Sequence, residues 1–321
     1  FDLFLWGVIP NLLVGNTVIH KASEQCVLSG KLFADIMVEA KFPEGVFSAV
    51  HGDGVQGAKL VDQDIDLIWF TGSSSVGKTL YATAGKKFIR SLLEMGGSNA
   101  AILFEDSDVD AAIPVLKFKR FAYCGQTCDA VKRLLVHKKI FSQVVETLRQ
   151  EVEKIVLGDP MDPKSEIGPL VSVVQRDLLA AQVSDAVKKG AKIVIGGKKP
   201  ARPGAYYLPT ILTEITPEMR VWKEEVFGPV LIVMPFETEA QAIKLANDTR
   251  YGLSAQVYTA DLDRAGRIAS ELKAGSIDIN GASHFKPFIP FGGYKESGMG
   301  REHGVHGFRE LCQMKVLSIK K

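Results

Sequence analysis

The 321-residue sequence has few cysteines, no excess of charge of one sign and no apolar run of the length of a membrane span. Its four cysteines, Cys26, Cys124, Cys128 and Cys312, are too few and too scattered for a disulfide-stabilised scaffold, so we expect a reducing, cytoplasmic setting. With 39 basic against 37 acidic side chains, the sequence lacks the charge pattern of proteins that bind nucleic acid or an anionic membrane. No metal site is predicted. A small molecule or another subunit is the expected partner.

The apolar start of the sequence, FDLFLWGVIPNLLVG (1–15), lacks a basic leader and a small-residue cleavage site. Pro10 interrupts this run well short of the length of a membrane span. We therefore expect neither a signal peptide nor an anchor. The run is typical of the middle of a larger core.

Short β-branched runs alternate with amphipathic stretches along the chain. This rhythm predicts parallel sheets with helices on their faces, and the length allows two domains. A second α/β unit is expected to begin after Gly97, with a helix entered through Asp108 and Asp110. The expected strands are residues 17–21, 46–50, 66–70, 92–95, 100–104 and 134–137, with a further strand at 313–321 that pairs with a neighbouring chain.

The segment FTGSSSVGKTL (70–80) places two glycines and three serines between an expected strand and an expected helix. Free backbone N–H groups and the helix dipole favour a phosphate at such a turn. Gly72, Gly77, Lys78 and Thr79 also match the letters of a Walker loop, although no obvious magnesium carboxylate follows. Taken alone, the segment leaves a nucleotide-phosphate cradle, a Walker loop and an ordinary tight turn open.

Seven blocks of sequence point to one family when they are read together: GNTVIHKASE (15–24), FTGSSSVG (70–77), LEMGGSNA (93–100), CGQTC (124–128), EEVFGPV (224–230), IDIN (277–280) and PFGGYKESGMGRE (290–302). In order and spacing they resemble the NAD(P)-dependent, non-acylating aldehyde dehydrogenase superfamily. The resemblance covers essentially the whole chain. It implies an α/β fold with two parallel-sheet domains and a homo-oligomer, either a dimer or a tetramer. The implied domains are a Rossmann-like cofactor-binding domain (1–96), a catalytic domain (97–296) and a C-terminal return with an oligomerisation strand (297–321).

The resemblance also assigns the cofactor. In the family the Gly-Ser turn binds the dinucleotide pyrophosphate, and a lysine and a glutamate hold the adenosine ribose. A carboxylate at that ribose would repel a 2′-phosphate, so NAD is favoured and NADP is the alternative. A charged helix start is the simpler interpretation of the Ser-Glu pair in KASE. The implied cofactor-binding residues are Lys21, Glu24, Gly72, Ser73, Glu225 and Phe227.

Thiol-dependent aldehyde oxidation needs a thiolate, donors for the oxyanion and a base that activates water. The resemblance implies Cys128 as the nucleophile and Glu94, 128 − 94 = 34 positions earlier, as the base. Glu302 matches an acidic position proposed for proton relay. The structural alternatives are a buried small thiol at Cys128, a cap for the Gly-Gly turn at Glu94 and an ordinary surface charge at Glu302.

Three aromatic residues, Trp6, Phe285 and Phe291, match positions that line the aldehyde tunnel of the family. Core packing is the alternative for each. The family members specific for succinic semialdehyde carry an arginine near the position of Ala122, so no carboxylate clamp is evident. Arg120 is close in sequence, but we expect it to point elsewhere.

The sequence also departs from the family pattern. The conserved Trp-Asn, whose amide forms half of the oxyanion hole, should lie just before Phe1, so we expect a natural truncation, a fragment or a protein completed by another chain. Asp129 follows the nucleophile and should raise the pKa of its thiol. Cys124 is either a buried thiol or a disulfide partner of Cys128. Two further functions therefore stay open: an inactive remnant that serves as a structural or interaction module, and a cofactor-independent thiol esterase.

Overall fold

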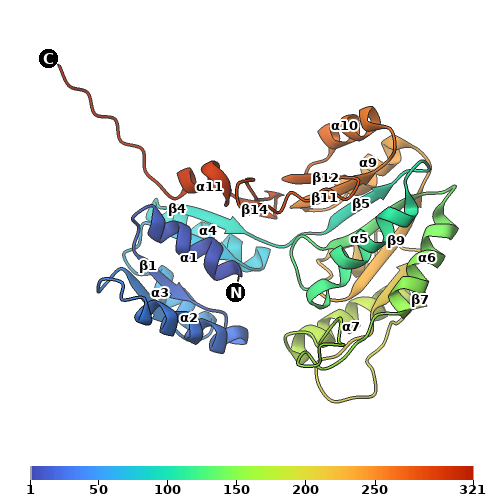
Figure 1. The fold of residues 1–321 in the computed structure, drawn as a ribbon, viewed down its shortest axis with the longest axis horizontal. Coiled ribbons are helices and arrows are strands. Elements are labelled where there is room, and N and C mark those ends of the chain that lie inside the picture. The colour runs from blue at the N-terminus through green and yellow to red at the C-terminus, as the bar shows by residue number, and fades with distance from the viewer. Residues whose placement is uncertain (1, 321) are drawn as a thin grey trace. The chain divides into compact units, whose positions relative to one another are not determined.

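A computed structural model describes residues 2–320, so Phe1 and Lys321 lie outside it. The chain divides into two compact units (Figure 1). Unit 1 runs to Met95 and also contains Phe285–Gly292 and the residues from Gly298 onward. Unit 2 contains Gly96–His284 and Gly293–Ser297. Both are α/β, as the sequence predicts, and none of the described helices has the length and apolar character needed to cross a bilayer.

Unit 1 holds two small sheets. Strands β1 and β2 pair in parallel, and β3 pairs in parallel with β4, whose other edge takes the short β14 in antiparallel orientation. The expected strands at 17–21, 46–50, 66–70 and 92–95 are confirmed to within two residues. Its helices and strands are α1 (Asp2–Leu13), β1 (Val18–Lys21), the 3-10 turn η1 (Glu24–Cys26), α2 (Val27–Glu39), β2 (Phe47–Val50), α3 (Gly54–Val61), β3 (Leu67–Thr71), α4 (Ser74–Lys87), β4 (Arg90–Glu94), β14 (Gly298–Met299) and α11 (Gly304–Glu310).

The apolar start of the chain forms helix α1, which continues through Pro10. A proline inside a helix removes one hydrogen bond, and its ring crowds the carbonyl four residues earlier, but packing of the helix can offset these costs. Phe4 and Val8 of α1 are buried against Phe33 and Met37 of α2. The rings of Phe4 and Phe33 stack with centroids 4.1 Å apart. This apolar run therefore belongs to a core, as predicted.

Unit 2 is built on a seven-stranded sheet of order β12-β11-β5-β6-β9-β8-β7, in which only the edge strand β7 is antiparallel to its neighbour. Both faces are covered. Along β5, Ile102 packs into one apolar cluster and Leu103 into the other, as the two-residue period of a strand requires. Its helices and strands are β5 (Asn99–Leu103), α5 (Val109–Phe121), the 3-10 turn η2 (Ala122–Gly125), β6 (Val131–His137), α6 (Phe141–Glu153), α7 (Val173–Lys188), β7 (Lys192–Ile195), β8 (Thr210–Thr213), α8 (Arg220–Lys223), β9 (Val230–Phe236), α9 (Glu239–Asn247), β10 (Tyr251–Gly252), β11 (Ser254–Tyr258), α10 (Leu262–Glu271), β12 (Ser276–Ile279) and β13 (Tyr294–Lys295).

Helices α5 and α6 pack on one face of this sheet, and α7, α9 and α10 pack on the other (Figure 1). Asp108 caps α5, because its Oδ1 accepts a hydrogen bond of 3.0 Å from the Ala111 N–H, which confirms the predicted helix start. Every residue of β5 and β6 is buried, and the loop that carries Cys128 leads directly into β6.

Residues 313–320 form no strand within this single chain and are exposed. The predicted oligomerisation strand would pair with another copy of the chain, so it stays a prediction.

Candidate active site

The glycine-serine turn of unit 1 links β3 to α4. Ser73 is the N-cap of α4, and its Oγ accepts a hydrogen bond of 3.4 Å from the Val76 N–H. The Gly72 N–H donates to the carbonyl oxygen of Glu94 at 3.0 Å. A Cβ added at Gly72 would lie 2.4 Å from the Phe70 ring, so a larger residue does not fit without a shift. The exposed turn thus leads straight into a capped helix N-terminus, the arrangement that suits a phosphate.

The end of β1 carries the predicted ribose-binding pair. Lys21 Nζ donates to the carbonyl oxygen of Ala22 at 2.9 Å and lies 3.9 Å from Glu24 Oε2. The Lys21 side chain is mostly buried, whereas that of Glu24 is 52% exposed. Ser23 caps the 3-10 turn that follows by accepting from the Gln25 N–H. Glu24 therefore starts a capped turn with its carboxylate open to solvent.

Two carboxylates are buried together in unit 1. Glu94, the last residue of β4, is 2% exposed, and Glu302 is 5% exposed. Both oxygens of Glu94 and Oε2 of Glu302 have no hydrogen-bond partner among the described residues. Burial, and then the charge of Glu302, raise the pKa of Glu94, while Arg301 lowers it. Burial raises the pKa of Glu302 to about 8. The pair thus disfavours double ionisation, and its unpartnered oxygens are able to accept a proton.

The three predicted tunnel aromatics gather in unit 1 around a histidine. The ring centroids of Trp6 and Phe285 are 5.1 Å apart, and those of Phe285 and Phe291 are 6.1 Å apart. His303 lies within 5.2–6.1 Å of all three rings. Its Nε2 is also 3.9 Å from Glu302 Oε1, and burial lowers its pKa. This aromatic cluster therefore adjoins the buried carboxylates.

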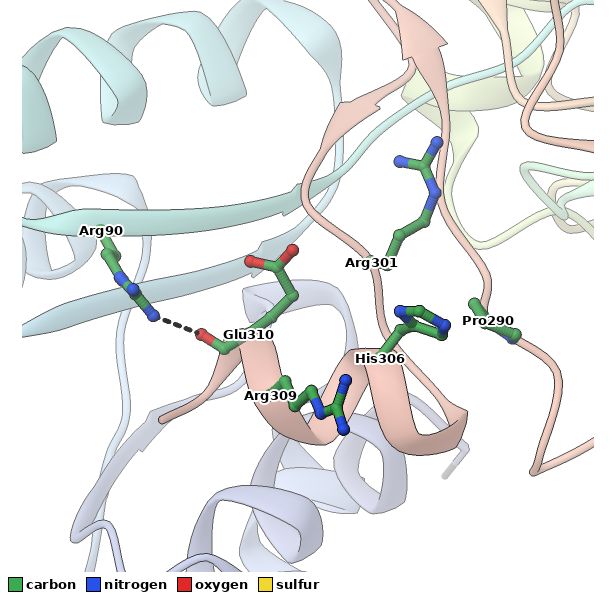
Figure 2. Close-up of a pocket in the computed structure, with 6 residues that line it drawn as sticks. All are labelled: Arg90, Pro290, Arg301, His306, Arg309 and Glu310. Carbon is green, nitrogen blue, oxygen red and sulfur yellow. Dashed lines mark hydrogen bonds between the residues drawn. The ribbon is translucent and has the colours of Figure 1, made fainter. Parts of the chain in front are cut away.

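A hollow of about 500 Å³ also opens in unit 1. Figure 2 shows Arg90 beside Glu310, whose carbonyl oxygen accepts a hydrogen bond of 3.4 Å from the Arg90 guanidinium. Three arginines against one glutamate make the hollow electropositive. None of the residues predicted from the sequence lines it, so it has no assigned part in catalysis. Its lining residues are Arg90, Pro290, Arg301, His306, Arg309 and Glu310.

Cys128 lies in unit 2, on the loop between η2 and β6, and is half-buried. The Asn99 side chain donates to the Cys128 carbonyl oxygen at 2.7 Å. Lys132 Nζ donates to the carbonyl oxygens of Thr127 at 3.1 Å and Cys128 at 2.9 Å. It also donates to Glu225 Oε1 at 2.9 Å. The main chain of the loop that carries Cys128 is therefore held by hydrogen bonds at residues 127 and 128.

Glu225 and Phe227, the predicted nicotinamide-ribose residues, adjoin this loop in unit 2. The Gly97 N–H donates to Glu225 Oε1 at 3.1 Å, and a Cβ added at Gly96 would lie 2.1 Å from Glu225 Oε2. The Phe227 ring centroid is 5.9 Å from Lys132 Nζ. The Gly-Gly pair thus leaves room for the carboxylate and donates to it.

Arg120 and Cys124 are both buried beside the loop. Arg120 Nη2 donates to the carbonyl oxygens of Val226, at 3.0 Å, and Gly228. Nη2 of the guanidinium is therefore bound to main chain. Cys124 is a buried thiol outside any disulfide, and burial raises its pKa to about 12. The structure therefore has Cys124 as a buried free thiol, and a reversible disulfide with Cys128 stays a prediction.

A family model described as the aldehyde dehydrogenase family matches residues 1–317. The chain belongs to the aldehyde dehydrogenase family. It is 38% identical over 321 residues to aldehyde dehydrogenase 1A1 of Mesocricetus auratus, covering 99% of this chain and 64% of that protein. It is 39% identical over 315 residues to betaine aldehyde dehydrogenase of Cereibacter sphaeroides, covering 98% and 65%. The chain thus spans about 65% of the length of these relatives.

Solved aldehyde dehydrogenase structures share the fold. Lactaldehyde dehydrogenase of Escherichia coli matches with a TM-score of 0.96 and 35% identity, over 99% of this chain and 67% of that one. An aldehyde dehydrogenase of Mycobacterium tuberculosis complexed with NAD+ matches with a TM-score of 0.94 and 36% identity, over 97% and 65%. The fold predicted from the sequence is therefore confirmed.

Sequence reasoning missed two residues that contact predicted site residues, one in each unit. Lys132 lies outside the seven sequence blocks, and only the burial of its side chain in the structure distinguishes it from other lysines. His303 directly follows Glu302, and that adjacency was the one available signal.

Proposed function

We propose that this chain carries the active site of an NAD(P)-dependent aldehyde dehydrogenase that produces a carboxylic acid. The observation that carries the proposal is the buried Glu94, whose two carboxylate oxygens lack hydrogen-bond partners among the described residues and whose pKa is raised by burial. A general base needs a pKa near the working pH and a free oxygen for a water proton. The family relationship adds support.

In the proposed cycle the Cys128 thiolate adds to the aldehyde carbon and forms a thiohemiacetal. NAD, when bound, supplies the acceptor for the hydride that leaves this carbon. A thioester on Cys128 remains. Glu94 takes a proton from water as the water oxygen adds to the thioester, and the C–S bond breaks to release the acid and regenerate the thiolate. Glu302, buried beside Glu94, is proposed to pass that proton onward.

The residues present fit a dinucleotide. Within unit 1, the capped turn at Gly72 and Ser73 offers N–H groups to a pyrophosphate, and the exposed Glu24 beside Lys21 offers a carboxylate to ribose hydroxyls. Within unit 2, the Glu225 carboxylate lies against Gly96 and offers Oε2 to a ribose hydroxyl. Relatives solved with NAD+ support the same cofactor. A negative charge at Glu24 favours NAD over NADP.

The substrate is proposed to be an apolar or semi-polar aldehyde. Trp6, Phe285 and Phe291 offer an aromatic lining, which suits such a group. We also propose that residues 1–96 bind the cofactor, that residues 97–296 form the catalytic domain, and that residues 297–321 support a homodimer or homotetramer.

The test is NADH formation from a short aliphatic aldehyde by the full chain, compared with Cys128→Ala and Glu94→Gln. Turnover that disappears in both variants supports the proposal. Absence of turnover together with absence of NAD binding by calorimetry would overturn it. Hydrolysis of a nitrophenyl ester without NAD, lost in Cys128→Ala, would instead identify a thiol esterase.

A further inference from the structure

A lysine is buried almost completely at the nucleophile loop. Lys132 is the second residue of β6, and its side chain is 1% exposed. A charged ammonium at such a position destabilises the fold unless it is fully paired. Leu134, Leu135 and Val136 of the same strand pack in the apolar clusters of unit 2, so Lys132 is a charge on a core strand.

The ammonium has three N–H donors, and three acceptors surround it. They are the carbonyl oxygens of Thr127 at 3.1 Å and Cys128 at 2.9 Å, and Glu225 Oε1 at 2.9 Å. Each donor therefore has its own acceptor. Two acceptors belong to the loop that carries the nucleophile, and the third is the carboxylate assigned to the cofactor ribose.

Asn99 and Gly97 also restrict the position of the loop that carries Cys128. Asn99 Nδ2 donates to the carbonyl oxygens of Cys128 at 2.7 Å and Ala130 at 3.0 Å. A Cβ added at Gly97 would lie 2.6 Å from the Cys128 carbonyl oxygen. The loop is thus held between Asn99 and Lys132, and a displacement of Lys132 would move it.

We propose that Lys132 is a positioning residue that ties the Cys128 loop to Glu225 and supplies the positive charge that offsets the carboxylates around the nucleophile. The proposal rests on the proposed function, because it takes Cys128 as the nucleophile and Glu225 as a cofactor ligand. It adds a residue to which the family resemblance assigned no role.

The charges around the loop explain why a cation is needed. Asp129 directly follows Cys128, and Glu225 bonds to the same ammonium as the Cys128 carbonyl. A nearby carboxylate disfavours a thiolate, whereas an ammonium favours it. Arg120, the other buried cation beside Glu225, donates instead to the main chain at residues 226 and 228. Lys132 is therefore the cation bonded to the loop itself.

Glu225 is oriented by the same bond. Lys132 and the Gly97 N–H both donate to its Oε1, which leaves Oε2 for a ribose hydroxyl. The Lys132 ammonium donates to both this carboxylate and the Cys128 carbonyl oxygen. A change in the hydrogen bonds of Glu225 would therefore also change the position of the Cys128 carbonyl.

The test measures the alkylation of Cys128 by iodoacetamide against pH, read by mass spectrometry of the Cys128 peptide because Cys26 and Cys312 are exposed thiols. Lys132→Met is expected to move the pH midpoint up by about one unit, the lower end of the effect of a neighbouring charge. At a pH well below the midpoint, the fraction of Cys128 present as thiolate falls about tenfold in the variant. Each thiolate is more basic and so reacts about threefold faster than in the wild type. The net rate of alkylation therefore falls about threefold.

Two further variants complete a cycle. Glu225→Gln is expected to lower the midpoint, and Lys132→Met with Glu225→Gln to return it to near the wild-type value. Lys119→Met removes a partly buried lysine that pairs at 3.8 Å with Asp278 elsewhere in unit 2, and should leave the midpoint unchanged. Thermal unfolding of each variant checks folding. If Lys132→Met does not fold, the comparison of Glu225→Gln with the double variant still measures the Lys132 charge.

A Lys132→Met profile that superimposes on the wild type would overturn the proposal. So would a double variant that stays as high as Lys132→Met, because a purely structural loop defect would not respond to Glu225. Alkylation needs neither cofactor nor turnover. Loss of the proposed dehydrogenase activity and failure of this charge effect are therefore separate results.

Discussion

Replacing Glu302 by glutamine should stabilise the protein, and increasingly so as the pH rises. Burial raises the pKa of this carboxyl to about 8 from an ordinary value of 4.5. Below the ordinary value, both the folded and the unfolded chain keep the proton. Between the two values the folded chain holds a proton that the unfolded chain releases, so the free energy of unfolding falls as the pH rises. Glutamine mimics the protonated acid and does not titrate.

The size of the effect follows from the difference between the two pKa values. About 3.5 units at about 1.36 kcal/mol each set a ceiling near 5 kcal/mol. Glu94 shares the buried site and takes part of the titration, so we expect a gain on the order of a few kcal/mol at pH 8 and almost none at pH 4.5.

The assay is urea unfolding of the wild type and Glu302→Gln at half-unit steps from pH 4.5 to 8.5. Subtracting the two free energies of unfolding at each pH removes the contribution of the titrating groups that both proteins share. Glu44→Gln, at an exposed glutamate of unit 1, is the matched control and should show no trend. A flat difference for Glu302→Gln would refute the buried-pair reasoning. The same substitution removes the charge that raises the pKa of Glu94, so the pH dependence of thioester hydrolysis should move to lower pH.

Three further outcomes are expected. Glu94→Gln should form about one NADH per chain in a burst and then stall, with the acyl group found on the Cys128 peptide by mass spectrometry, because water lacks its base; steady turnover would contradict the assignment. Glu24→Ser should raise the affinity for NADP relative to NAD in calorimetric titrations, since the charge that repels a 2′-phosphate is gone; an unchanged ratio would show that Glu24 does not meet the ribose. Gly125→Ala should lower thermal stability by about 1–3 kcal/mol, because Gly125 has φ +69 and a Cβ would lie 2.5 Å from the Gly228 carbonyl oxygen; an unchanged melting temperature would contradict this.

The sequence was sufficient for the alternation of strands and helices up to about residue 137. Local rules fix it: short apolar runs such as 67–70 become strands, and Asp108 caps α5 through a hydrogen bond to its own helix. The family blocks, read in order, also led to the family that the comparisons establish.

The tertiary structure decided the environment of each group. Glu94 and Glu302 are 208 positions apart (302 − 94), and β14 pairs with β4 to bring their segments together, so no local pattern could reveal a shared buried site. The aromatic cluster around His303 likewise joins α1 to a segment near the other end of the chain.

Lys132 marks the limit of sequence reasoning. The sequence by itself determined that a lysine follows Cys128 by four residues, ahead of the expected strand at 134–137. Only the fold determined that its ammonium is buried and bonded to the nucleophile loop and to Glu225, 93 positions later (225 − 132). A side-chain charge is visible in the sequence, but its desolvation and its partners are set by chain segments that only folding brings together.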